Sequence, residues 1–211
     1  MTRSELKIGV LALQGDFEAH LQALKEIGIP SIEIRDPARL GELDGLIIPG
    51  GESTTLLKLL GCEGMEAIRR FGRRGGVVLG TCAGLILLAH DVRDPAQESL
   101  GLLDATVTRN AYGRQVESFH AVGQWEGEEN RPLEMTFIRA PRIQDFGGGV
   151  TVLARFKGEP VMIRQNRILG ATFHPELTAD RSVHALFVQL AHEAARAPSE
   201  KVKEAAEPCQ Q

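Results

Sequence analysis

Residues 79–90, LGTCAGLILLAH, lead from the end of an apolar strand through two glycines into a helical pattern. The central GTCAG has the G-x-nucleophile-x-G form of a nucleophile elbow, with cysteine in place of serine. Small neighbours suit this turn, because it is sharp and strained and larger side chains would clash or cover the sulfur. The stretch therefore predicts a strand, a tight turn that exposes the Cys82 thiol, and a helix over 83–90.

The sequence on both sides of this stretch predicts how the sheet is built. Up to about residue 90, strand-like runs alternate with helical patterns, which favours βαβ units around a parallel sheet. These segments are KIGVLALQ, FEAHLQALKEIG, SIEIR, GLIIPGG, TTLLKLLG and GVVLGTC. From residue 105 to about 173 the pattern changes to short β-rich segments, which we expect to be largely antiparallel. They are ATVTR, VESFHAVG, EMTFIRA, VTVLARF, PVMIR and RILGATF.

The end of the sequence predicts a final helix and a tail. Val183, Leu186, Phe187 and Leu190 recur at helical spacing after Asp180, a plausible helix cap. Beyond residue 197 the chain is polar and poor in large apolar residues. We therefore expect one α/β domain over residues 1–197, with a mixed central sheet flanked by helices, and a mobile polar tail over 198–211.

Composition limits the class of protein. The 211 residues fit one large α/β domain, and a hydrophobic fraction of 43% is ordinary for a folded, water-soluble protein. A formal net charge of −4 without a dense basic run gives no support to nucleic-acid binding. The apolar run over residues 6–13 lacks a basic leader and is too short to span a bilayer. We expect a cytoplasmic protein that contacts neither nucleic acid nor membrane.

A cysteine nucleophile needs a base, because an ordinary thiol with a pKa of about 8.5 is mostly protonated at pH 7. Among the six histidines, His174 is the best candidate, since it follows the apolar run ILGATF and precedes Pro175 and Glu176. On a loop, this spacing lets the Glu176 carboxylate turn toward a ring nitrogen and fix the tautomer. Cys82, His174 and Glu176 together indicate a Cys-His-Glu triad. The plainer alternatives are an inert buried cysteine and a His-Pro turn with a solvated glutamate.

The other histidines have weaker patterns. His20, His184 and His192 fall in helical segments and are expected to be surface or packing residues. His90 ends the helix predicted after Cys82. His120, in a β-rich segment, remains as the second candidate for the base, after His174.

Attack on an amide carbonyl also requires donors for the oxyanion. The run PGGESTT, residues 49–55, can supply backbone N–H groups from Gly50 and Gly51 and from the start of a helix over 54–60. Capping of that helix by Ser53 is the simplest alternative role for the same run. The run lacks the Gly-Lys-Ser/Thr ending of a phosphate-binding loop.

Taken in order, LALQGDFEAH, PGGESTT, GTCAGL, RNAYGRQVESF, FIRAP and ATFHPELTAD resemble the class I glutamine amidotransferases. Within that class the chain is most similar to the glutaminase subunits of pyridoxal 5′-phosphate synthase. The resemblance covers residue 6 to about 190. It implies a three-layer, flavodoxin-like amidotransferase fold and hydrolysis of L-glutamine through a γ-glutamyl thioester, with no cofactor and no metal. It also implies a glutamine pocket lined by Gly51, Glu52, Ser53, Arg109, Ile138 and Arg139.

The same resemblance implies a partner. Ammonia would pass to a separate (β/α)₈ synthase subunit in a large hetero-oligomer that makes pyridoxal 5′-phosphate. The loop that contains Gln14 would lie near both the active site and that partner, so the free chain is expected to be a weak glutaminase. One departure is His120, where members of this family usually carry glutamate after Ser-Phe. Three other activities stay open from the residues: hydrolysis of γ-glutamyl peptides, redox sensing by Cys82, and a non-catalytic adaptor role.

Overall fold

The computed structural model describes residues 6–109, 118–127 and 131–196. Within these ranges nine strands form a central sheet in the order β2-β1-β3-β4-β12-β11-β10-β7-β8, and three more form a small sheet in the order β5-β6-β9. The strands of the central sheet are β1 (Ile8–Leu11), β2 (Ser31–Ile34), β3 (Gly45–Ile48), β4 (Val77–Thr81), β7 (Phe119–Trp125), β8 (Pro132–Phe137), β10 (Thr151–Phe156), β11 (Glu159–Gln165) and β12 (Ile168–Ala171). The small sheet contains β5 (Ala89–Arg93), β6 (Leu103–Thr108) and β9 (Arg142–Phe146).

The central sheet has a parallel half and an antiparallel half. Strands β2, β1, β3, β4 and β12 pair in parallel, while β12-β11, β11-β10, β10-β7 and β7-β8 are antiparallel pairs. The sequence therefore predicted both halves correctly. Two strands of the β-rich region of the sequence are exceptions: β12 pairs in parallel with β4, and β6 of the small sheet pairs in parallel with β5.

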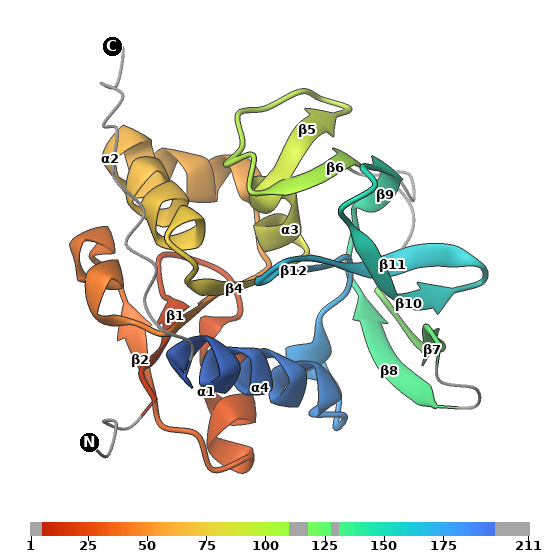
Figure 1. Ribbon diagram of the computed structural model, residues 1–211. Coiled ribbons are helices and arrows are strands. Elements are labelled where there is room, and N and C mark those ends of the chain that lie inside the picture. Colours follow the sequence, from red (N-terminus) through yellow and green to blue (C-terminus); the bar gives the residue numbers. More distant parts are fainter. Residues whose placement is uncertain (1–5, 110–117, 128–130, 197–211) are drawn as a thin grey trace.

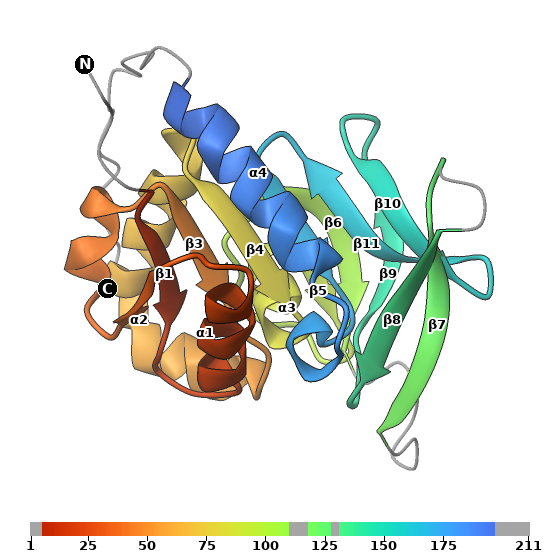
Figure 2. The same ribbon diagram turned by 90° about the horizontal axis from the view of Figure 1, so that it is seen from below.

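Helices cover both faces of the parallel half. One side carries α1 (Phe17–Glu26) and α4 (Ser182–Arg196), and the other carries α2 (Ser53–Arg73) and α3 (Ala83–Leu88), as Figure 1 shows in edge view. Figure 2 shows α1 and α4 lying along one face, with the antiparallel strands extending beyond them. Short 3₁₀ helices occupy Pro37–Glu42 and Pro175–Leu177. The predicted three-layer α/β fold with a mixed sheet is confirmed.

The buried strands divide their side chains between two cores. Along β3, Leu46 and Ile48 pack into the core beneath α2 and α3, whereas Ile47 packs into the core beneath α1 and α4. Side chains of a strand alternate between faces, so a strand covered on both sides is apolar throughout. This explains the continuous apolar run GLII that predicted the strand.

Some predicted boundaries differ. The helix after Cys82 ends at Leu88 rather than at residue 90, and His90 lies in β5. Asp180 accepts a hydrogen bond from the N–H of Ser182, the first residue of α4, at 2.8 Å. The predicted tail over 198–211 lies outside the described residues. No helix among the described residues is long and apolar enough to cross a membrane.

The close packing of α3 predicts a strong effect of one methyl group. A Cβ added to Gly84 would lie 2.1 Å from the carbonyl oxygen of Ile48 on β3, so the helix would have to move away from the sheet. We expect Gly84→Ala to lower the free energy of unfolding by about 1–3 kcal/mol, as overpacking does. Gly148→Ala is the control, because nothing lies within 4 Å of its added Cβ. Urea unfolding of both variants measures the difference, and equal stabilities would contradict this packing.

Candidate active site

The sequence-predicted site residues gather at one edge of the parallel half. Gln14 follows β1, Gly50 and Gly51 follow β3, Cys82 follows β4 directly, and His174 follows β12. These strands are neighbours in the sheet order β1-β3-β4-β12, and parallel strands all present their carboxyl ends at the same edge. Segments far apart in the sequence therefore meet there.

Cys82 occupies the predicted elbow. It lies between β4 and α3 with a φ of 49° and ψ of −102°, a conformation that is costly for a residue with a Cβ. The backbone N–H of Cys82 donates to the carbonyl of Ala171 at 2.9 Å, which ties the turn to β12. A Cβ on Gly80 would lie 2.6 Å from the Gly84 backbone, so both glycines of GTCAG permit the close approach of helix and strand.

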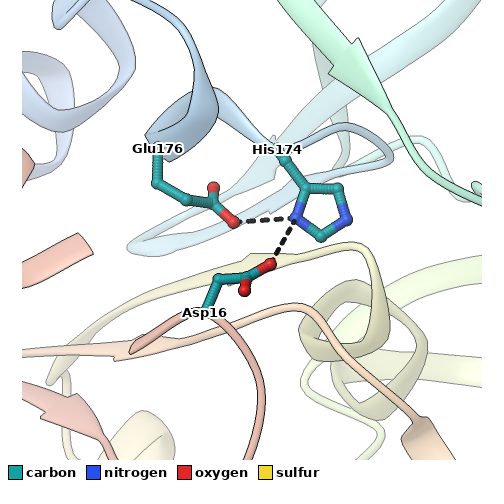
Figure 3. Close-up of side chains that lie close together, drawn as sticks. All are labelled: Asp16, His174 and Glu176. Carbon is teal, nitrogen blue, oxygen red and sulfur yellow. Dashed lines mark hydrogen bonds and ion pairs between the residues drawn. The ribbon is translucent and has the colours of Figure 1, made fainter. Parts of the chain in front are cut away.

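His174 and Glu176 form a buried pair. The His174 Nδ1 and the Glu176 Oε1 are 2.8 Å apart, and Figure 3 shows the carboxylate pointing at this nitrogen while Nε2 lies on the opposite side of the ring. Nε2 makes no conventional hydrogen bond among the described residues, and the Cys82 thiol is a further group that interacts with the imidazole. The structure thus brings together the three residues of the predicted triad.

The surroundings of His174 favour its charged form. Burial alone would lower the imidazole pKa, but hydrogen bonding to Cys82 and Glu176, and their negative charges, outweigh burial and raise the pKa from 6.5 to about 10. Burial likewise acts to raise the pKa of Glu176, yet His20 and His174 outweigh it and keep the carboxylate ionised. The site is built to hold an imidazolium beside a carboxylate.

This raised pKa predicts how stability depends on pH. A group that binds a proton more tightly when folded stabilises the protein fully below its unfolded pKa of 6.5, and that stabilisation is lost as the pH rises through about 10. The free energy of unfolding should therefore fall between these values, with His174 contributing at most about 1.4 kcal/mol per pH unit. Urea unfolding across this pH range should show a shallower fall for His174→Asn. His192→Asn, on the exposed side of α4, should match the wild type; a wild-type slope in His174→Asn would refute the assignment.

Asp16 adds a second carboxylate to the site. Its Oδ2 lies 3.9 Å from the His174 Nδ1, and half of its side chain is exposed. Among the described residues, Asp16, His174 and Glu176 are also the group whose ligand atoms are close enough together to surround a metal ion. The His174 Nδ1, which both carboxylates face, is already bonded to Glu176 at 2.8 Å. His174 and Glu176 are therefore arranged as a charge pair.

A pocket of about 220 Å³ opens onto Cys82 and His174. Its walls include every residue that the sequence resemblance assigned to the glutamine pocket, namely Gly51, Glu52, Ser53, Arg109, Ile138 and Arg139. The Ile138 carbonyl lies 3.8 Å from the Cys82 Sγ, and Arg139 has a φ of 43°. A pocket smaller than the roughly 300–1,000 Å³ usual for drug-sized ligands suits a small molecule such as an amino acid.

Glu52, and not Ser53, caps helix α2. Its carboxylate accepts hydrogen bonds from the backbone N–H groups of Thr54 and Thr55 at 3.2 and 2.6 Å. Partial burial acts to raise the Glu52 pKa, but these bonds and those from both threonine hydroxyls outweigh it and lower the pKa to about 2. The Ser53 hydroxyl instead donates to Gln97 Oε1 at 2.8 Å. The alternative role considered for Ser53, capping of this helix, is therefore carried out by the residue before it.

The glycine loop packs tightly between two partners. A Cβ on Gly50 would lie 2.3 Å from the His174 ring, and one on Gly51 would lie 2.4 Å from the Gln14 side chain. The Gln14 Oε1 accepts a hydrogen bond from the Glu52 N–H at 3.0 Å, while its Nε2 is buried without a partner among the described residues. Gln14 therefore connects the loop after β1 to the loop that was expected to supply oxyanion donors.

Two histidines that the sequence left as surface or packing residues lie beside the site. His20 on α1 and His184 on α4 are fully buried, and the His20 Nε2 lies 3.2 Å from the Glu176 Oε2. Both fill apolar positions of helical patterns, so nothing in the sequence separated them from core residues. His120 is exposed on β7 and its Nδ1 lies 2.8 Å from the Thr136 hydroxyl.

Comparisons with known proteins agree with this geometry. The model of the SNO glutamine amidotransferase family matches residues 10–193. The chain is 52% identical over 187 residues to pyridoxal 5′-phosphate synthase subunit PdxT of Koribacter versatilis, covering 88% of this chain and 95% of the relative. It is 48% identical over 190 residues to the subunit of the same name from Niallia circulans, covering 90% and 100%. A crystal structure of a glutamine amidotransferase is 46% identical, with a TM-score of 0.82 over 88% of this chain and 98% of that one.

The three-layer fold, with a cysteine at the turn after β4, is that of the class I glutamine amidotransferases. The family model covers most of the chain, and the two relatives named above are about half identical to it. These matches assign the chain to one family within this class. The chain belongs to the SNO glutamine amidotransferase family.

Proposed function

We propose that this chain hydrolyses the side-chain amide of L-glutamine to L-glutamate and ammonia, and that Cys82, His174 and Glu176 carry out the reaction. The observation that carries the proposal is the buried His174–Glu176 pair beside the elbow thiol, at the mouth of a pocket of amino-acid size. The name shared by the relatives from Koribacter and Niallia supports the role of glutaminase subunit of a pyridoxal 5′-phosphate synthase.

The reaction runs in two halves. The Cys82 sulfur attacks the amide carbon of glutamine, and the imidazolium of His174 gives its proton to the departing nitrogen, so that ammonia leaves and a γ-glutamyl thioester forms. A water molecule then gives a proton to His174 and attacks the thioester, the carbon–sulfur bond breaks, and glutamate leaves. Glu176 keeps the imidazole in one tautomer and stabilises its charge through the 2.8 Å bond.

The pocket walls match the charges of a free amino acid. Arg109 and Arg139 line the pocket and would pair with an α-carboxylate, and charge-assisted pairs of this kind are stronger than neutral ones. The Arg109 Nη2 is 3.4 Å from the Glu52 Oε1, which holds the guanidinium at the pocket wall. The carboxylates of Glu52 and Asp16, which also line the pocket, are acceptors for an α-ammonium group.

A partner synthase receives the ammonia and stimulates its release. In the free chain, the Glu52 N–H is bonded to the Gln14 side chain, so the loop beside Cys82 is held by an internal contact instead of facing a substrate oxyanion. Binding of a (β/α)₈ synthase subunit near Gln14 would release this contact and align the donors, which is a population shift between two loop states. The assembly is a large hetero-oligomer in the cytoplasm.

The test is ammonia release from glutamine, measured for the full chain with and without the synthase subunit. We expect slow release from the chain alone and a clear stimulation by the synthase. Full activity that the synthase leaves unchanged would refute the gating, and absence of glutamate in both cases would refute the glutaminase assignment. Parallel assays with γ-glutamyl peptides identify a peptidase if these are cleaved faster than free glutamine.

A further inference from the structure

Behind the proposed triad lies a second layer of buried titratable groups that the reaction does not use. His20 on α1 and His184 on α4 are both fully buried, although the elements that carry them are far apart in the sequence. The His20 Nδ1 and the His184 Nε2 are 3.0 Å apart. On its other side, the His20 Nε2 lies 3.2 Å from the Glu176 Oε2 and 3.3 Å from the Thr81 hydroxyl.

The chemistry of these contacts fixes where the protons lie. An ionised carboxylate only accepts, so the short contact with Glu176 requires a proton on the His20 Nε2. Burial lowers the pKa of His20, so the ring is neutral and its Nδ1 is an acceptor. The proton of the next bond then belongs to the His184 Nε2, which leaves the His184 Nδ1 bare; this atom is buried without a partner among the described residues.

His174 and His20 therefore lie on the two sides of the Glu176 carboxylate, each with a ring nitrogen close to one of its oxygens. His174 donates to its Oε1 at 2.8 Å. The His20 Nε2, which is hydrogen-bonded to the Thr81 hydroxyl, lies 3.2 Å from the Oε2, and this buried oxygen has no hydrogen bond of good geometry among the described residues. Without His20 beside it, this buried oxygen would also lose its contact with a polar N–H group, and the carboxylate would be freer to rotate or take up a proton. Both changes would weaken the bond that orients His174.

We propose that His20 is a positioning residue for glutamine hydrolysis, which holds Glu176 in the orientation that aligns His174, and that His184 fixes the tautomer His20 needs for this. The inference rests on the proposed function, because it acts through the Glu176–His174 pair. Neither histidine touches the pocket that contains Cys82. Their effect is on the rate of the chemical steps and not on the binding of glutamine.

Three variants of His20 test this in the full-length chain with the synthase subunit present. In His20→Gln the amide N–H ends near the position of Nε2 and still reaches Glu176, whereas leucine in His20→Leu fills similar space without a donor. We expect His20→Leu to lower kcat for glutamine by about tenfold to a hundredfold with little change in KM, as loss of an outer orienting contact does. His20→Gln should retain most of the activity. His20→Asn is polar but too short to reach Glu176, so it should resemble His20→Leu and replaces it if that variant does not fold.

A double variant separates positioning from general damage to the fold. In a Glu176→Gln background, His20→Leu should cause little further loss, because the group it positions is already neutral. Losses that multiply would overturn the proposal, as would equal impairment of His20→Gln and His20→Leu, or wild-type kcat in His20→Leu and His20→Asn. His192→Leu, an exposed histidine of α4, is the matched control. If Cys82→Ala and Glu176→Gln are themselves active, the proposed triad is refuted. If these two variants are inactive while His20→Leu and His20→Asn keep the wild-type kcat, only the role of His20 is refuted.

Discussion

Replacing Cys82 by alanine should reduce release of glutamate from glutamine to the background rate, a loss of about 10⁴-fold or more, as expected when a covalent nucleophile is removed. The fold should persist, because Cys82 is a small side chain and its contact with β12 is made by the backbone N–H. Glutamate formation in the presence of the synthase is the measurement. Urea unfolding of the same variant verifies that the protein is folded.

Covalent labelling completes this experiment. A glutamine analogue with an electrophilic side chain should add one equivalent of mass to the wild type at Cys82 and none at that position in Cys82→Ala. Labelling that does not depend on Cys82, or glutamate release by the variant, would place the reaction elsewhere. A chain that is labelled but never turns over glutamine would favour the redox or adaptor roles.

The second large effect concerns the carboxylate. Glu176→Gln keeps the size of the side chain but presents an amide to the His174 Nδ1, which favours the wrong tautomer and removes the charge that stabilises the imidazolium. We expect kcat to fall by about 10³- to 10⁴-fold with little change in KM, by analogy with other triads. Steady-state kinetics with the synthase present measures both constants.

Glu159→Gln is the matched control for this variant. Glu159 is an exposed glutamate at the start of β11, paired with Arg142 at 2.6 Å, and lies outside the pocket. It should have wild-type kinetics. A similar loss in both variants would indicate that acidic residues in general, and not Glu176 in particular, support the activity.

The sequence predicted the residues at the carboxyl edge of the sheet because their local chemistry is explicit. Small residues around Cys82 indicate a tight turn, and a proline between His174 and Glu176 indicates a loop in which the carboxylate can fold back. The structure places these side chains together. The pocket residues were found only through the resemblance to a family, since an isolated arginine such as Arg139 has no distinctive pattern.

The second layer of histidines could not be predicted from the sequence. His20 and His184 occupy apolar positions of amphipathic helices, where a buried polar ring has the same spacing as a leucine. Only the packing of α1 and α4 on the same face of the sheet brings them into contact. The end of α3 was misplaced for a related reason, because the apolar run continues without a break from the helix into the partly buried strand β5.

The proposed reactive groups and several of the residues that line the pocket come from different parts of the fold. Cys82 and His174 follow strands of the parallel half, whereas Arg109 follows β6 of the small sheet, and Ile138 and Arg139 follow β8 at the outer edge of the antiparallel half. Substitutions of the Arg109 and Arg139 side chains would therefore change the charge of the pocket wall from strands other than those that carry Cys82 and His174. This separation would allow evolution or protein engineering to change the amide substrate while the reactive residues stay the same.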